Sequence, residues 1–308
     1  MKQPYDLDPD DRADESVRKI LLRLFGRLRE NVARVIEDVD TEFLHDLRVA
    51  NRRTRTVLSQ IKDVLPASVV DTFRSEFKWL GDVTGPCRDL DVFLLEMDSY
   101  QQRSKIDDGA LRPLQDFLTD KRRVEHHRVR AALQSARLQD LAEGWGRFLE
   151  TTTTKDDEPP LASTPIVEVA SPRIHRAYRR MWKRSTGRDD PPPAAVLHRL
   201  RIDGKKLRYL LEFFSDLYTS TTVSRFINEL KQLQDILGGL NDTVVQLALI
   251  DEFADQRDTS ATTLAAMSRL TDAIANRQRE LRTDFADHFA LFAGDESRKR
   301  YRKKFKAG

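Results

Sequence analysis

The chain has 308 residues, of which 53 are Lys or Arg and 50 are Asp or Glu, so its formal net charge is +3. A charged fraction of 33% beside 39% hydrophobic residues indicates a globular protein and excludes a chain that is disordered throughout. No apolar run approaches the roughly 18 residues of a membrane-spanning helix, so we expect no membrane association. Only 12 Gly and 12 Pro are present, which is few for a turn-rich β architecture and favours an all-α fold.

The start of the chain and its cysteine content predict an intracellular location. The first residues lead into an acidic segment and have neither the basic nor the apolar region of a secretory signal. Cys87 is the only cysteine, so neither an intrachain disulfide nor a cysteine-rich metal site can form. We therefore expect a cytoplasmic protein that holds no metal and no cofactor.

A first helical unit is predicted over residues 15–150, after an acidic N-terminal tail at residues 1–14. Its apolar residues recur at helical spacing, beginning with Val17, Ile20, Leu21, Leu24 and Leu28. Further helices are expected at about residues 41–65, 68–83 and 110–135. Pro66 ends the first of these three, and Gly85-Pro86 breaks the chain after the second.

Residues 151–165 are predicted to link this unit to a second one at residues 166–293. The linker begins with a polar, acidic stretch that ends in two prolines. A long helix near residues 262–292 completes the second unit. Residues 294–308 follow, with seven bases and no acid between positions 298 and 306, and we expect a solvated basic C-terminal tail.

The two units are copies of one another. A shift of 153 residues aligns Leu44–Arg48 with Leu197–Arg201 and continues without a gap. The same shift pairs Arg23 with Arg176, Arg27 with Arg180, Gly85 with Gly238 and Asp89 with Asp242. We therefore expect Gly238-Gly239 to break the second unit as Gly85-Pro86 breaks the first, and the two aspartates to cap the helices that follow. Duplicated helical units of this kind commonly pack about a pseudo-two-fold axis.

The best-matched helix carries a stripe of cations in both copies. At about 100° per residue, four basic or imidazole side chains fall within about 80°, while the leucines face the core. The stripe consists of His45, Arg48, Arg52 and Arg55 in the first copy and of His198, Arg201, Lys205 and Arg208 in the second. Arg53 and Lys206 border it on the other side.

Like charges at this spacing destabilise a helix by about 0.2–0.5 kcal/mol per pair, so something should compensate them. If only one helix carried the stripe, acids on neighbouring helices would be enough to compensate its cations. Repetition of the stripe, although neighbouring surface positions differ between the copies, favours a ligand instead. The stripe is about 15 Å long, which is too long for one phosphate group and suits an extended polyanion in a groove between the two copies.

These residues resemble the two signature helices of the CHAD family, the conserved histidine α-helical domain. The segments that carry the resemblance are Leu44–Arg55, Leu197–Tyr209, Arg88–Val92 and Leu237–Asp242, and it extends over about residues 15–293. It implies two tandem pseudo-symmetric bundles of about four to five helices each, with a basic central groove or channel. It also implies binding of inorganic polyphosphate, often at polyphosphate granules. Many members carry a CYTH-type catalytic domain, which is not found here, so we expect a stand-alone member.

The resemblance also implies which side chains face polyphosphate. This set is His45, Arg48, Arg52, Arg53, Arg55, His198, Arg201, Lys205, Lys206 and Arg208, followed by Arg23, Arg27, Arg176 and Arg180. Arg123 and Arg130, on a basic helix face around His126-His127, are further candidate anion contacts.

Three alternatives remain open. A nucleic-acid binder would share the phosphate chemistry, but the stripe offers no aromatic residue on which a base could stack. A granule scaffold is compatible with the same binding. A metal-dependent phosphohydrolase built on His45-Asp46 is disfavoured, because Asp46 points about 100° away from His45 and is replaced by Arg199 in the second copy. No other catalytic constellation is found, so we expect a protein that is not an enzyme.

Overall fold

The computed structural model describes residues 5–107, 109–151, 158–185, 192–256 and 259–306. Over these ranges the chain is helical, apart from turns and an isolated β-bridge between Arg12 and Pro165. The predicted all-α fold is therefore confirmed. None of the described helices combines the length and apolar content needed to cross a membrane.

The helices of the first repeat are α1 (Ala13–Ile36), α2 (Thr41–Gln60), α3 (Ala67–Val83), α4 (Gly85–Ser104), α5 (Arg112–Leu133) and α6 (Ala136–Glu150). Those of the second are α7 (Ile166–Ser185), α8 (Ala194–Phe213), a 3-10 turn (Ser215–Leu217), α9 (Ser220–Gln256), α10 (Ala261–Ala293) and α11 (Asp295–Phe305).

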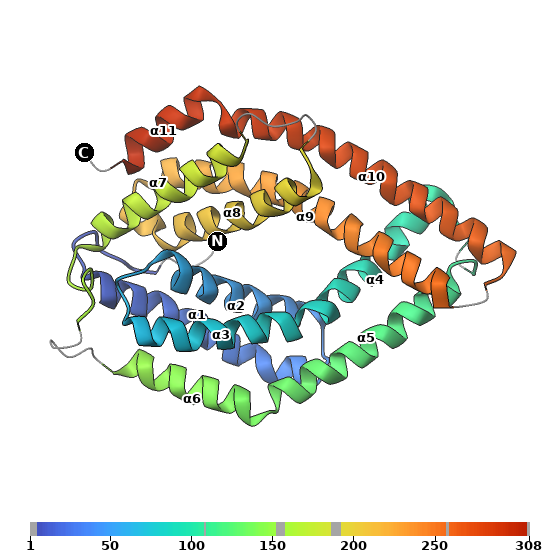
Figure 1. Cartoon of the computed structure of the whole chain (residues 1–308), viewed down its shortest axis with the longest axis horizontal. Coiled ribbons are helices and arrows are strands. Elements are labelled where there is room, and N and C mark those ends of the chain that lie inside the picture. Colours follow the sequence, from blue (N-terminus) through green and yellow to red (C-terminus); the bar gives the residue numbers. More distant parts are fainter. Residues whose placement is uncertain (1–4, 108, 152–157, 186–191, 257–258, 307–308) are drawn as a thin grey trace.

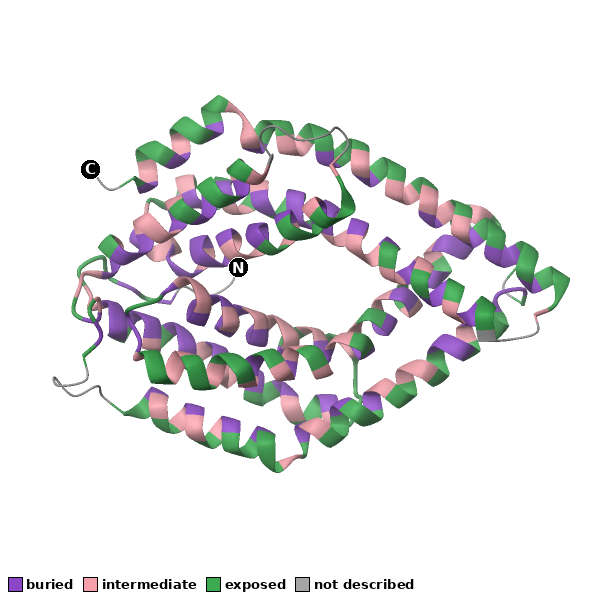
Figure 2. Cartoon of the chain, viewed as in Figure 1, coloured by how far each residue is buried: buried purple, intermediate pink, exposed green. Residues whose placement is uncertain are grey.

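The helices form two layers that converge at one end of the molecule (Figure 1). One layer holds α1, α2, α3 and α6, and the other holds α7, α8, the first half of α9 and α11. α4 and α5 extend from the first layer and meet α10 and the end of α9 at the converging end. Exposed residues follow the outer faces of α6, α10 and α11, whereas buried residues follow the contacts between helices (Figure 2).

α2, which carries the first stripe, begins and ends at identifiable signals. The Asp40 carboxylate accepts a hydrogen bond from the Glu42 N–H (2.8 Å) and so caps the helix start. The helix ends at Gln60, earlier than the predicted residue 65, because the chain turns before Pro66. In that turn Asp63 has a positive φ of 69°, and its carbonyl accepts a hydrogen bond from the Leu161 N–H (2.8 Å).

The predicted break at Gly85-Pro86 is present, but the one predicted at Gly238-Gly239 is wrong. Thr84 separates α3 from α4, and Pro86 lacks the N–H that a continuous helix would need there. The glycines of the second repeat keep their N–H groups, and α9 runs through them without interruption. Gly239 serves close packing instead, since a Cβ on it would lie 3.0 Å from Leu281 Cδ1 of α10.

Asp89 and Asp242, predicted as N-caps, lie inside helices. α4 already begins at Gly85, and α9 begins at Ser220, so neither aspartate stands at a helix start. Their repeat-related positions bring both side chains to the wall of one cavity.

The apolar core consists of two clusters, and each draws residues from both repeats. The larger cluster contains Leu47 of α2 together with Leu207 of α8. The smaller contains Phe117 of α5 and Phe253 of α9, whose ring centroids lie 5.4 Å apart. The two repeats therefore share their apolar interior.

Both chain ends pack on the helices over their described parts, so the prediction of two tails is wrong there. Tyr5 and Leu7 are buried on the N-terminal side. Near the other end, α11 buries Tyr301 and Phe305, and the Tyr301 ring stacks on Tyr178 at 3.9 Å between centroids. One aromatic pair at i, i+4 is thus enough to dock a helix whose other faces are basic.

Residues 158–165 of the predicted linker lie against the start of α1. The Ala13 N–H donates a hydrogen bond to the Thr164 carbonyl (2.9 Å), and the Asp14 N–H donates one to the Ala162 carbonyl (3.0 Å). Residues 152–157 lie outside the described residues.

Candidate anion-binding site

A cavity of about 640 Å³ lies between α2 and α8, with α4, α9 and α10 completing its wall. The lining includes His45, Arg48 and Arg52 from α2 and Arg201, Lys205 and Arg208 from α8. All six side chains are half-buried. Two stripes that are 153 residues apart in the sequence therefore meet in one space.

The core faces of the two helices fix the direction of the stripes. Leu44 and Leu47 of α2 are buried, and so are their counterparts Leu197 and Leu200 of α8. Arg48 is held further by hydrogen bonds from its Nη1 to the Gly81 carbonyl (2.9 Å) and to Thr84 Oγ1 (2.8 Å). The stripe is thus anchored on one side by the core and on the other by the end of α3.

The cations of the cavity lie close together and partly out of water, which opposes their charged forms. Burial, followed by repulsion from Arg201 and Arg52, lowers the pKa of Lys205 to about 7. Burial and then Arg52 lower the pKa of Arg48 to about 10. Burial and then neighbouring arginines also lower the pKa of His45. An anion bound here would relieve repulsion at all of these groups.

Further cations in the wall come from residues that the sequence analysis did not select. Arg88 and Arg103 project from α4 and Arg277 from α10. Arg88 is anchored by a hydrogen bond from its Nη1 to the Thr41 carbonyl (3.2 Å). The signal for Arg88 was available, because it opens the motif Arg88–Val92. No sequence signal identified Arg103 or Arg277, since they reach the cavity only through the packing of α4 and α10.

Carboxylates also face the cavity. Asp89 and Asp242 are repeat-related, and Glu96 and Asp235 lie nearby in the wall. The surrounding protein, which displaces water, raises the pKa of both Asp89 and Asp242, while Arg48 lowers the first and Arg201 the second. The cations outnumber the carboxylates among the described lining residues, so the cavity suits an anion.

Two members of the predicted set on α2 do not line this cavity. Arg53 is buried between the repeats, where its Nη2 lies 2.7 Å from Glu212 Oε2 of α8 and its guanidinium stacks 5.1 Å from the Phe213 ring centroid. Arg55 lies beside Gly81 on α3, so close that a Cβ on that glycine would be 2.8 Å from Arg55 Nη1. Arg53 thus joins α2 to α8, while Arg55 packs against α3.

Two members of the predicted set on α8 also lie elsewhere. His198 is exposed near the start of the helix and does not line the cavity. Lys206 is half-buried on an adjacent face, where burial and the nearby Arg180 and Arg184 lower its pKa and Asp203 raises it. Helical rotation explains Lys206, since it is one residue and about 100° from Lys205.

The remaining predicted arginines are distributed over other surfaces. The Arg23 guanidinium stacks on the Tyr5 ring at 4.7 Å from the centroid, with Arg27 close by. Arg176 and Arg180 line a separate groove on α7. Arg123 and Arg130 are exposed on α5, where Arg123 Nη2 pairs with Asp120 Oδ1 at 2.9 Å. None of these six lines the cavity.

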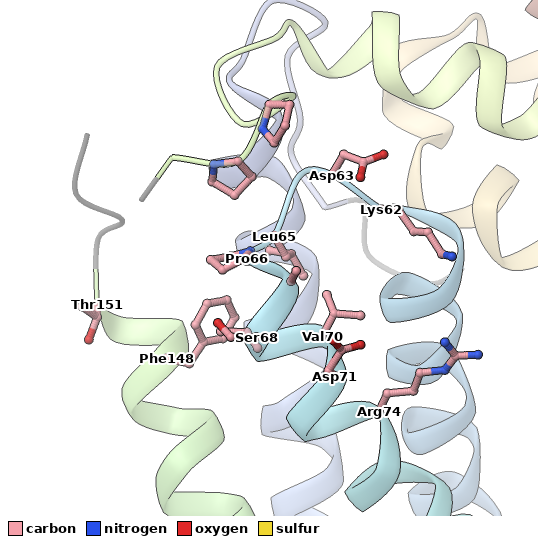
Figure 3. Close-up of a pocket in the computed structure, with 14 residues that line it drawn as sticks. Lys62, Asp63, Leu65, Pro66, Ser68, Val70, Asp71, Arg74, Phe148 and Thr151 are labelled. Carbon is pink, nitrogen blue, oxygen red and sulfur yellow. The ribbon is translucent and has the colours of Figure 1, made fainter. Parts of the chain in front are cut away.

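A larger groove of about 780 Å³ lies between the start of α3 and the end of α6 (Figure 3). Its wall mixes apolar side chains such as Leu65 and Phe148 with Lys62, Asp71 and Arg74. It holds no residue of the stripes and no excess of one charge. The smaller, more cationic cavity is therefore the candidate site.

The residues of the proposed phosphohydrolase alternative do not converge. His45 lines the cavity, while its neighbour Asp46 is exposed. The described residues contain no group of three or more His, Cys, Asp or Glu side chains placed to hold a metal ion.

Comparisons with known proteins agree with this architecture. A solved structure of the CHAD domain from the plant Ricinus communis is 29% identical, with a TM-score of 0.74, and the match covers 94% of this chain and 96% of that one. PptA from Streptomyces chartreusis is 17% identical, with a TM-score of 0.73 and coverage of 91% and 99%, and shares the fold. No curated protein sequence matches the chain. The sequence profile of the CHAD domain matches residues 19–251, and the chain therefore belongs to the CHAD domain family.

Proposed function

We propose that this protein binds inorganic polyphosphate in the cavity between α2 and α8 and does not catalyse a reaction on it. The observation that carries the proposal is that three members of each of the two repeat-related cationic stripes line a single cavity. Membership of the CHAD family supports the same ligand. Polyphosphate is a thin chain with a negative charge at every phosphate, so successive groups can meet the arginines and Lys205 in turn.

The dimensions and the aromatic residues of the cavity favour polyphosphate over nucleic acid. A cavity of about 640 Å³ can hold a segment of a thin chain. It is too small for a DNA duplex, whose major groove alone is about 12 Å wide. Tyr100 and Tyr209 do line the cavity, but both are buried, and the Tyr209 ring has the guanidinium groups of Arg53 and Arg208 within 5.3 and 5.4 Å of its centroid. Neither ring is therefore available for stacking with a base.

The direct test removes cations from both stripes at once. In R52A/R201A/K205A we expect affinity for polyphosphate to fall at least a hundredfold, measured by isothermal titration calorimetry at fixed salt, because each repeat loses phosphate contacts. A matched control, R123A/R128A/R130A, removes three cations from the exposed surface of α5. Circular dichroism and thermal melting check that both variants stay folded.

Two outcomes would contradict the proposal. One is retained affinity in the folded cavity variant. The other is displacement of long-chain polyphosphate by DNA or RNA at equal phosphate concentration and salt, which would favour a nucleic-acid binder.

In cells, we expect the protein to gather at polyphosphate granules, either as a bound protein or as a scaffold. Fluorescence microscopy of a tagged copy, in cells with and without polyphosphate, tests this. Granule localisation that persists in the cavity variant would mean that another surface directs it.

A further inference from the structure

A second concentration of cations lies outside the cavity, on α7 and at the end of α11. A groove of about 530 Å³ is lined there by His175, Arg176, Arg179, Arg180, Lys183 and Lys306. None of its described lining residues carries a carboxylate. The wall of the cavity between α2 and α8, by contrast, includes four acids beside its arginines.

The arginines in the middle of this groove lack compensating charges. Arg173 and Arg184, at the two ends of the same helix face, pair with Asp63 and Asp203. Within the described residues, Arg176, Arg179 and Arg180 form no ion pair, and all three are exposed. Arg179 and Arg180 follow Arg176 by three and four residues, so each of them repels Arg176 along the helix.

Comparison of the two repeats indicates that this charge is a specific feature of the second one. Arg179 and Lys183 correspond to Gly26 and Glu30 in the first repeat, which therefore lacks two of the cations.

The arginines that both repeats share have different surroundings. In the first repeat, the buried Tyr5 covers Arg23 and lies near Arg27. Their counterparts Arg176 and Arg180 are exposed in the groove. The fold can thus cover this face, and the second repeat leaves it open and adds charge to it.

A link between the groove and the cavity runs over α8. Lys206 follows the cavity residue Lys205 directly in sequence and lies on the adjacent helix face. Burial lowers the pKa of Lys206, Asp203 raises it, and the positive charges of Arg180 and Arg184 act on it in the same direction as burial. Lys206 thus lies on α8, between the groove residue Arg180 of α7 and the cavity residue Lys205, with Asp203 as the nearby acid.

We propose that the α7 groove is a second polyphosphate site that binds another segment of the chain held in the cavity. This inference rests on the proposed function and deepens it, because it makes affinity depend on chain length. The ligand class follows from the composition of the groove wall. Its described residues include cations and no acid, and their only aromatic rings are the fully buried Phe305 and the imidazole of His175. Binding of the second segment would be intramolecular and would raise the affinity for long chains only.

The test compares R176A/R179A/R180A with the α5 variant R123A/R128A/R130A, which loses the same number of positive charges. Short polyphosphate, which fills only the cavity, and long-chain polyphosphate are titrated into each protein. For the α7 variant we expect at least a tenfold loss of affinity for the long chain and no change for the short one. The slope of log affinity against log salt for the long chain should fall by about 2, since about 0.7 counterions are released per phosphate contact. The α5 variant should match the wild type.

Other outcomes would overturn the inference. Equal losses in the α7 and α5 variants would mean non-specific attraction. An equal loss for short and long chains would mean that the groove is not a separate site. Loss of duplex DNA binding, with long-chain polyphosphate binding retained, would assign the groove to nucleic acid. Failure of the cavity site itself is recognised separately, because the variant R52A/R201A/K205A would then keep its affinity for the short chain.

Discussion

Lys205 shows how burial can make binding by a single side chain depend on pH. Its pKa is about 7 in the free protein against an ordinary value of 10.5, because it is buried and faces Arg201 and Arg52. Bound phosphate groups would raise that pKa, so binding takes up a proton. We therefore expect the affinity for polyphosphate to fall about tenfold between pH 7 and pH 8.5. Titration calorimetry in buffers of different ionisation enthalpy measures both the affinity and the proton uptake.

The variant Lys205→Arg is the control, because arginine stays charged over this range. It should bind with little pH dependence above pH 7. Stability changes in the opposite direction: unfolded Lys205 holds more protons between about pH 7 and pH 10, so the wild type becomes more stable as the pH rises through that window. An affinity of the wild type that is constant with pH would contradict this role of Lys205.

The carboxylates Asp89 and Asp242 are single side chains that repel the negative charges of the proposed ligand. Both face the cavity, and the surrounding protein raises the pKa of both. We expect D89N/D242N to bind polyphosphate at least tenfold more tightly at neutral pH, because two negative charges near the phosphates are removed. The advantage should shrink as the pH falls and the wild-type carboxylates become protonated.

A single exchange at Asp235, an exposed carboxylate in the same wall, serves as the comparison. D235N should change affinity less than D89N or D242N alone. Weaker binding by D89N/D242N would show that the two carboxylates position the arginines instead of competing with the ligand.

At the scale of helices, the equivalent contacts α2–α3 and α8–α9 are packed with the large and the small residue on opposite helices. Asn51 of α2 faces Gly81 of α3, and a Cβ on that glycine would lie 3.1 Å from Asn51 Nδ2. In the second repeat the order is reversed, because Gly204 of α8 faces Gln234 of α9. Gln234 Nε2 donates a hydrogen bond to the Gly204 carbonyl (2.7 Å). A large and a small residue have thus exchanged places across the same helix contact.

This exchange makes Gly204 intolerant of a larger side chain. A Cβ there would already lie 3.3 Å from Met181 Cε, so we expect Gly204→Asn to lower the free energy of unfolding by about 1–3 kcal/mol. Gly238→Ala is the control, since nothing lies within 4 Å of its Cβ position in the continuous α9. It should raise stability by about 1 kcal/mol, measured by chemical denaturation. Destabilisation by Gly238→Ala would contradict the continuous helix.

At the scale of the whole molecule, the repeats are held together as one body. Each apolar cluster includes both copies, and the buried Arg53 of the first repeat pairs with Glu212 of the second. We expect a single cooperative unfolding transition, followed by both calorimetry and far-ultraviolet circular dichroism. Two separate transitions would contradict a shared core.

Arg53→Ala tests the contact between the repeats. Because Arg53 also packs on Tyr209 and Phe213, we expect a loss of about 3 kcal/mol in the free energy of unfolding. Affinity of the folded variant for polyphosphate should be close to that of the wild type, since Arg53 does not line the cavity. A large loss of affinity without a loss of stability would return Arg53 to the ligand-facing set.

The sequence by itself determined the helical class, the duplication and the stripes, because each depends on local spacing or on residue identity at a fixed offset. Leucines at helical intervals placed the core faces of α2 and α8, and the adjacent face that carries His45 or Arg201 followed from the rotation per residue. The break at Gly85-Pro86 was equally local, since a proline removes a hydrogen bond wherever it stands.

Only the tertiary structure decided which cations share a space. Arg53 and Arg52 are neighbours in the sequence, yet one is buried against Glu212 and the other lines the cavity. Arg277 reaches the cavity from α10, and the basic end of the chain docks through Tyr301. Local spacing gives the direction of a side chain from its own helix, but what that side chain meets depends on helices that are distant in sequence.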